Sequence, residues 1–138
     1  MAVTASFQFL YVLIIMEPGS RRILHCNVTA HPTAEWTAPQ FREAIPSEHR
    51  YRFLIHGRDS IFSPEFDHEL AQGFGLTALR TPPKSPQANA HCERLVGTMR
   101  RGCLDFLIPP TERHLRRLLR GWVRHYNLVS YYPTSLCS

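Results

Sequence analysis

Several sequence features are scarce in this 138-residue chain, and each scarcity excludes a class of protein. The four cysteines, at positions 26, 92, 103 and 137, form no C-x-x-C pair and no disulfide framework of a small secreted protein, so we expect reduced thiols. The longest nearly apolar run, residues 7–16, is too short to span a bilayer. No basic residue precedes it and no small-residue cleavage site follows, which argues against a secretory signal. We expect a cytoplasmic protein without a membrane partner.

Acidic residues are scarce in the carboxyl-terminal part of the chain. Residues 1–88 carry eight basic and eight acidic residues, whereas residues 89–138 carry eight arginines and three acids and so account for the net charge of +5. A neutral part followed by a basic part predicts a polyanionic partner, such as DNA, on the carboxyl-terminal side. Lys84 is the single lysine. The dominance of arginine suits phosphate recognition, although genome base composition explains it equally well.

The order of apolar patterns predicts one α/β domain over residues 1–138. Strands are expected over residues 7–16, 21–29, 50–56 and 76–80, where β-branched and aromatic residues gather. Helices are expected after three capping residues: Thr33, Ser63 and Thr111. Pro39 should kink the first of them, and the second should end near Gly75. Strands that alternate with helices favour a mixed sheet flanked by helices.

The stretch from Ser85 to Arg101 carries the strongest functional signal. Asn89 is a plausible N-cap, so Glu93 is expected in the first turn of a helix, at the positive end of its dipole. Arg94, Arg100 and Arg101 follow. A carboxylate beside a basic helix suits a site that holds a divalent metal against a phosphate backbone. A solvated glutamate in a first turn explains the same residues without a function.

Several motifs resemble the catalytic core of the DDE integrases and insertion-sequence transposases. They are Ser-Pro-x-Ala-Asn-Ala-x-x-Glu-Arg (residues 85–94), Arg-Arg-x-Cys-Leu-Asp (100–105), residues 52–62, residues 79–83 and His-Tyr-Asn (125–127). The resemblance implies a ribonuclease-H-like fold and Mg²⁺-dependent DNA strand transfer. It also implies that Glu93 is the third acid of a metal-binding triad of two aspartates and one glutamate.

Two of these three acids are not found where the resemblance implies them. Gly57 occupies the position of the second acid, and the intervening residues 58–92 have the spacing of the family. Asp59 is the alternative ligand nearby, although its ordinary role is that of a turn residue. The first acid would lie on a strand just before the hairpin that begins at Phe7, and residues 1–6 contain no acid. We therefore expect the chain to begin after the first acid, to lack the central strand of the sheet, and to be catalytically inactive.

Other interpretations of the sequence remain open. The first is a non-catalytic module that binds DNA or pairs with a second copy or an intact transposase, and its candidate DNA-binding residues are Arg94, Arg100, Arg101, Arg116, Arg117 and Arg120. An ordinary solvated face accounts for the same arginines. His25, Cys26, His91 and Cys92 could form a zinc site, but neither pair has the usual ligand spacing. Gly102 inside a helix, like Pro39, suggests drift in a copy no longer selected for function.

Overall fold

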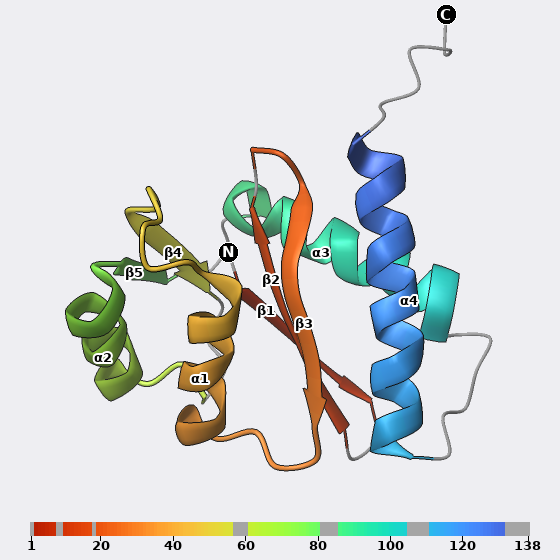
Figure 1. The fold of residues 1–138 in the computed structure, drawn as a ribbon, viewed down its shortest axis with the longest axis horizontal. Helices are drawn as coiled ribbons and strands as arrows, with labels where there is room; N and C mark the ends of the chain where they lie inside the picture. Colours follow the sequence, from red (N-terminus) through yellow and green to blue (C-terminus); the bar gives the residue numbers. More distant parts are fainter. Residues whose placement is uncertain are drawn as a thin grey trace, which may run out of the picture.

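The computed structural model describes residues 2–7, 10–17, 19–56, 61–80, 86–104 and 111–131. They form a five-stranded sheet with helices packed against it (Figure 1). The strands are β1 (Ala2–Phe7), β2 (Leu10–Glu17), β3 (Arg22–Thr29), β4 (Phe53–His56) and β5 (Thr77–Arg80), in the spatial order β3-β2-β1-β4-β5. The helices are α1 (Ala34–Ala44), α2 (Pro64–Phe74), α3 (Pro86–Met99) and α4 (Glu112–Tyr131), and a π-helical turn, η1 (Arg100–Leu104), extends α3. The predicted mixed α/β class is confirmed.

The central strand, which the sequence led us to expect missing, is present as β1. It pairs antiparallel with β2 from Ala2 opposite Ile15 to Phe7 opposite Leu10, and parallel with β4 where Ala2 lies opposite His56. The sheet is therefore continuous through its centre. The prediction was wrong because residues 2–6 are mostly small and carry no large apolar side chain, so the strand pattern became visible only at Phe7.

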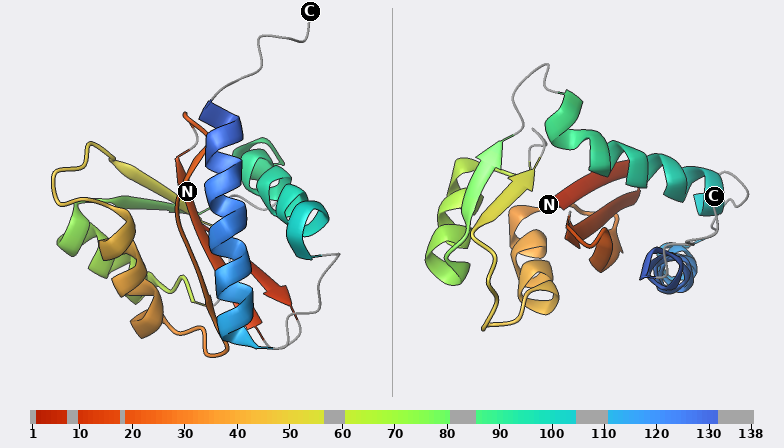
Figure 2. Two further views of the ribbon diagram at one scale, coloured as in Figure 1. Left: turned by 45° about the vertical axis from the view of Figure 1, so that its right-hand side comes forward. Right: turned by 90° about the horizontal axis from the view of Figure 1, so that it is seen from above.

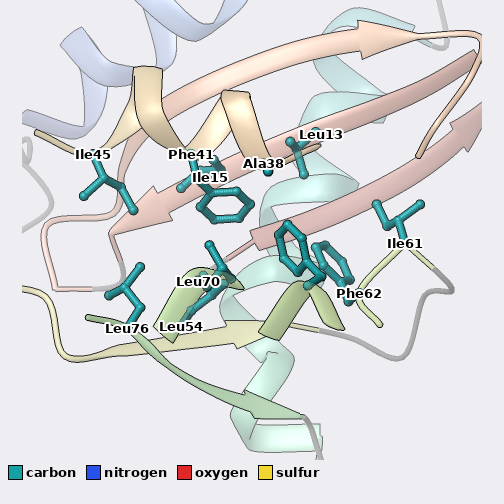
Figure 3. Close-up of a cluster of buried hydrophobic side chains, with 11 residues drawn as sticks. Leu13, Ile15, Ala38, Phe41, Ile45, Leu54, Ile61, Phe62, Leu70 and Leu76 are labelled. Atoms are coloured by element: carbon teal, nitrogen blue, oxygen red, sulfur yellow. The ribbon is translucent and has the colours of Figure 1, made fainter. Parts of the chain in front are cut away.

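Two buried layers cover the two faces of the sheet. In the first core layer, α1 and α2 pack on alternate residues of β2 and β4, including Leu13, Ile15 and Leu54 (Figure 3). The rings of Phe41 in α1 and Phe66 in α2 meet with centroids 5.6 Å apart. In the second core layer, the other residues of β2, Val12, Ile14 and Met16, pack with Leu95 and Met99 of α3 and Leu115 and Leu119 of α4. The alternation of β2 between the layers is the period-2 pattern of a strand covered on both faces.

The predicted helix boundaries at three polar residues are confirmed. The Thr33 hydroxyl accepts a hydrogen bond from the Trp36 N–H (3.1 Å), and Ser63 and Thr111 act likewise on Phe66 and His114. Each cap satisfies a backbone donor that the first helical turn leaves without a partner. Gly75 ends α2 with φ +67°, a left-handed conformation that glycine adopts without a steric penalty.

Helix α1 runs from Ala34 to Ala44 through Pro39. Proline lacks the N–H that would bond the Glu35 carbonyl, but Glu35 and Pro39 are both exposed on the outer face of the helix. Solvent can therefore replace the missing donor. Toward the sheet, the Thr37 hydroxyl donates to the Thr33 carbonyl (2.7 Å).

Gly102 has a packing role that the sequence did not reveal. A Cβ built on Gly102 would lie 3.0 Å from Nε1 of Trp122, so the indole of α4 occupies the space that a side chain would need. Trp122 also stacks on Tyr126, with centroids 5.2 Å apart. The glycine is therefore explained by the close approach of η1 and α4, and drift need not be invoked.

We expect Gly102→Ala to lower the free energy of unfolding by about 1 kcal/mol, because the new methyl group must displace Trp122. Gly121→Ala is the matched control: it lies inside α4, its Cβ would meet nothing within 4 Å, and it should stabilise the protein by about 0.5–1 kcal/mol. Urea denaturation of both variants measures the two changes. Stabilisation by both would show that Trp122 moves aside without cost.

Helix α4 covers the free edge of β3, the outermost strand on its side of the sheet (Figure 2). The Asn127 side chain accepts a hydrogen bond from the Ile23 N–H (2.9 Å) and donates one to the Ile23 carbonyl (3.0 Å). Further along the strand, Arg116 donates to the Val28 carbonyl (3.0 Å). These side chains bond outward-facing backbone groups that an edge strand would otherwise expose for pairing with another chain.

Candidate functional site

The region where β4 ends beside β1 is where the predicted acid site should lie. The six residues of β1 include no aspartate or glutamate, and β4 ends at His56. Gly57 and Asp59 lie outside the described residues. The described strands β1 and β4 therefore contribute no carboxylate where they meet.

His56, the last residue of β4, is held inside the first core layer. Its side chain is 0% exposed and its Nε2 lies 2.8 Å from Oδ1 of Asp67, in the first turn of α2. The imidazole also stacks on Phe62, with ring centroids 4.6 Å apart. The carboxylate of Asp67 lies next to the end of β4, but it is already bonded to the buried side chain of His56.

Glu93 lies on α3, but not in its first turn. The helix begins at Pro86, so Glu93 is the eighth of its 14 residues, and Asn89 lies within the helix instead of capping it. The expected contact with the positive end of the helix dipole was therefore wrong, because that field acts mainly on the first turn. The sequence placed the start too late because Pro86 was taken to end the preceding segment, whereas proline is well suited to a first helical turn. The Glu93 side chain is exposed.

The other described carboxylates with recorded partners are paired elsewhere in the fold. The Tyr51 hydroxyl donates to Glu17, and this hydrogen bond, together with one from Ser20, lowers the pKa of Glu17. The same contact raises the pKa of Tyr51, because its proton is held by the carboxylate. Glu112 pairs with Arg116 at 2.6 Å.

The described residues do not provide the ligand set of a metal site. They contain no group of three or more His, Cys, Asp or Glu side chains arranged to hold an ion. Mg²⁺ requires converging oxygen ligands, and the exposed carboxylate of Glu93 alone does not supply them. For the zinc alternative, Nε2 of His25 is 2.7 Å from Oε1 of Gln40, and the side chains of His91 and Cys92 lie outside the description.

The arginines of α4 fall into two groups. Arg113, Arg117, Arg120 and Arg124 recur at intervals of four, three and four residues, so they follow one face of the helix; all are exposed, and we call them the arginine strip. The apolar residues Leu115, Leu119 and Trp122 occupy the opposite face and pack in the second core layer. A shallow depression of about 290 Å³ lies among the arginines at 113, 116, 117 and 120.

Arg116 lies beside the strip but is used within the fold. Its guanidinium donates to Oδ1 of Asn27 (2.9 Å), to the Val28 carbonyl (3.0 Å) and to Oε1 of Glu112 (2.6 Å). Its side chain is 33% exposed. The sequence grouped Arg116 with Arg117 and Arg120, because helical spacing does not show which arginine reaches a neighbouring strand.

Three further candidate DNA-binding residues lie in the second half of α3 and in η1. Arg94, Arg100 and Arg101 are exposed, and the Arg101 guanidinium lies over Gly97. Since η1 contacts α4, this basic segment and the arginine strip belong to neighbouring helical elements (Figure 2).

Comparison with known proteins identifies relatives for part of the chain and for its fold. Residues 75–129 match the family model of the integrase core domain. A 59-residue stretch is 37% identical to an uncharacterized protein of the insertion element IS136 from Agrobacterium fabrum, and the same values hold for an IS136 protein of Agrobacterium tumefaciens. That stretch is 43% of this chain but only 30% of the length of either relative.

Two solved structures resemble the fold over nearly the whole chain. The catalytic core domain of BIV integrase matches 96% of this chain and 82% of its own, with a TM-score of 0.61 and 16% identity. A chain of the simian T-cell lymphotropic virus intasome, solved with PP2A regulatory subunit B56 gamma, matches 99% of this chain and 55% of its own, with a TM-score of 0.69 and 13% identity. These matches confirm the predicted ribonuclease-H-like fold. In the described part of the chain, no helix is both long and apolar enough to cross a membrane.

Proposed function

We propose that this integrase-core protein of the mobile-element type binds DNA without catalysing strand transfer. The exposed arginine strip on α4 is the observation that carries the proposal, and the absence of converging carboxylates among the described residues supports its second half. Integrase cores are generally metal-dependent enzymes that act on DNA. We infer that this chain has kept the DNA-binding part of the integrase-core role and has lost the catalytic part.

The chemistry that we infer for an intact core of this type is an in-line displacement at phosphorus assisted by Mg²⁺. Two metal ions about 4 Å apart would stabilise the attacking and leaving oxygens, which requires two or three carboxylates around one point. Here β1 has no acid, Gly57 has no side-chain oxygen, and Glu93 would remain the one inherited ligand, with Asp59 as the nearby alternative. Such a ligand set is too incomplete to hold two metal ions around one phosphate.

An assay with a labelled DNA duplex tests the inactivity directly. With Mg²⁺ or Mn²⁺ we expect no nicking or joining above a blank without protein, and we expect Glu93→Gln to leave that result unchanged. Activity that disappears in Glu93→Gln would overturn this half of the proposal and identify Glu93 as a working ligand. Activity that persists in Glu93→Gln would point to a contaminating nuclease.

The arginine strip has the dimensions and chemistry of a phosphate-binding surface. From Arg113 to Arg124 the helix rises by roughly 16 Å, enough to follow several phosphates of one DNA strand. Guanidinium groups bind phosphate oxygens through paired hydrogen bonds. The strip faces away from the core, so binding DNA there requires no rearrangement of the second core layer.

We expect the triple change Arg113→Ala, Arg117→Ala and Arg120→Ala to weaken binding to a 30-base-pair duplex by at least about tenfold at low salt. The slope of log affinity against log salt should fall in magnitude by about 3, because three phosphate contacts are lost. Fluorescence anisotropy over a salt series measures both.

The matched control replaces Arg42, Arg50 and Arg52, which are exposed and lie outside α4, by alanine. Both triple variants lose three positive charges, so an effect of net charge alone would weaken both equally. Equal losses, or an unchanged salt slope in the α4 variant, would contradict the assignment of the DNA surface to the arginine strip.

A second candidate function, self-association, is favoured by apolar residues near the end of α4. Leu128 and Val129 are each 58% exposed, although both are aliphatic. Contact with a second copy or with an intact transposase would cover them. Sedimentation analysis tests this function. We expect association of the wild-type protein, and we expect the Leu128→Ser, Val129→Ser variant to lose it if this patch is the contact surface.

A further inference from the structure

The β2–β3 turn, which includes residues 19–21, contains an arginine in a strained conformation. In the part of the chain that the structure describes, Arg21 is the only residue other than glycine with a positive φ, at +59°. In this left-handed conformation the Cβ of an L-residue crowds the backbone, so glycine or asparagine is the usual occupant. Turn formation alone does not call for arginine at this position, and a strained residue directs attention to what its side chain does.

Hydrogen bonds within the turn hold its backbone in place. The side chains of Tyr51 and Ser20 both bond Glu17, which lowers the pKa of that carboxyl, and the charge of Arg22 lowers it further. The Ser20 hydroxyl oxygen also accepts a hydrogen bond from the Arg22 N–H (3.3 Å). The carboxylate of Glu17 therefore ties the turn to the segment that precedes β4, and it balances the charge of Arg22.

The side chain of Arg21 takes no part in these bonds. It is exposed, and within the described residues it has no hydrogen-bond or ion-pair partner. The turn thus fixes the backbone of Arg21 while its guanidinium remains available to a ligand outside the fold.

Helix α4 and strand β3 run side by side in opposite directions. Arg116 bonds the Val28 carbonyl near the end of β3, and Asn127, eleven residues later in α4, bonds the backbone of Ile23 near its start. Moving toward the carboxyl end of α4 therefore leads along β3 toward the β2–β3 turn. Figure 1 shows the turn and this end of α4 at the same end of the molecule.

This arrangement places Arg21 beyond the last residue of the arginine strip. Arg124 lies three residues before Asn127 in α4, and Arg21 lies two residues before Ile23. With about 1.5 Å per helical residue and about 3.3 Å per extended residue, Arg21 lies roughly 11 Å beyond Arg124 along the direction of α4. The strip and the turn together form a basic line of roughly 27 Å.

We propose that Arg21 is a further DNA-contacting residue, which extends the phosphate-binding surface from α4 onto the β2–β3 turn. This inference rests on the proposed function of the arginine strip. The guanidinium of Arg21 binds a phosphate of the same duplex beyond those held by the strip, through paired hydrogen bonds. Because the turn already fixes its backbone, less conformational entropy is lost on binding.

Two variants that remove the charge and suit a left-handed backbone, Arg21→Gly and Arg21→Asn, test the proposal. We expect each to weaken binding to the 30-base-pair duplex by about threefold to tenfold at low salt, and to lower the magnitude of the salt slope by about 1. Melting temperatures no lower than that of the wild type would show that the protein stays folded. Arg21→Lys keeps the charge and should keep the salt slope.

Two single changes are the matched controls. Arg22→Ala removes the neighbouring charge, which Glu17 balances, and Arg42→Ala removes an exposed charge from α1. Both should leave the salt slope unchanged, and losses equal to those of the Arg21 variants would overturn the proposal as an effect of net charge.

Failure of this proposal is distinguishable from failure of the proposed function. If the triple α4 variant loses binding while Arg21→Gly and Arg21→Asn keep the wild-type affinity and salt slope, the assignment of Arg21 is wrong and that of the arginine strip stands. If the wild-type protein does not bind the duplex, both are wrong.

Discussion

Replacing Arg116 by alanine is expected to lower the free energy of unfolding by about 2–3 kcal/mol and to leave the salt dependence of DNA binding unchanged in the protein that remains folded. The guanidinium is bonded to Asn27, to the Val28 carbonyl and to Glu112. Its removal leaves the part-buried Val28 carbonyl without this donor, while Oδ1 of Asn27 keeps only its bond from the Val28 N–H. Hydrogen bonds that involve a charged group are the stronger ones.

Arg117→Ala, one residue further along α4, is the matched comparison and should behave in the opposite way. Arg117 is exposed, so its loss should change stability by no more than about 0.5 kcal/mol, yet should weaken DNA binding. Chemical denaturation and anisotropy on the two variants separate the roles. If Arg116→Ala lowered the salt slope as much as Arg117→Ala, both arginines would contact phosphate and the division of α4 proposed above would be wrong.

Replacing Asn127 by alanine is expected to cost about 2–3 kcal/mol and to make the protein associate at its sheet edge. The Asn127 amide both accepts from and donates to the backbone of Ile23, which lies 104 residues earlier. Without it, a part-buried N–H and carbonyl of β3 lose their partners, and the edge strand becomes available to another chain. Urea denaturation and concentration-dependent sedimentation measure the two effects.

Asn127→Asp sharpens this prediction. A carboxylate can still accept from the Ile23 N–H, but it places negative charge against the Ile23 carbonyl, so we expect a loss at least as large as that of the alanine variant at neutral pH. His125→Ala, an exposed change on the same helix, should have little effect. A stable, monomeric Asn127→Ala would show that α4 does not protect the edge of β3.

The parts of this fold that sequence analysis predicted well depend on local chemistry. The caps at Thr33, Ser63 and Thr111 were predictable, because each side chain bonds a backbone N–H in the first turn of its own helix. The helix end at Gly75 was predictable because glycine readily adopts the left-handed conformation found there. The apolar face of α4 was likewise visible as helical spacing and now packs in the second core layer. The integrase-core motifs were visible for a similar reason, since each occupies a contiguous stretch; all except residues 52–62 lie within the matched residues 75–129.

Two of the errors arose where partners come from distant parts of the chain, and a third arose from the local ambiguity of a proline. β1 was missed because its small residues have little strand pattern of their own and are ordered by pairing with β2 and β4 on either side. The helix start at Pro86 was misplaced because a proline both ends one segment and begins the next. Gly102 was taken for drift because the indole that needs its space lies twenty residues away.

The sequence by itself therefore determined the α/β class, the helix caps at Thr33, Ser63 and Thr111, the helix end at Gly75 and the resemblance to integrase cores. Those properties reside in short runs of residues whose chemistry acts locally. Only the tertiary structure decided that β1 is the central strand and that Arg116 and Asn127 bond the edge of β3. These depend on strand order and on contacts across about a hundred residues, and neither is encoded in the spacing of any single segment.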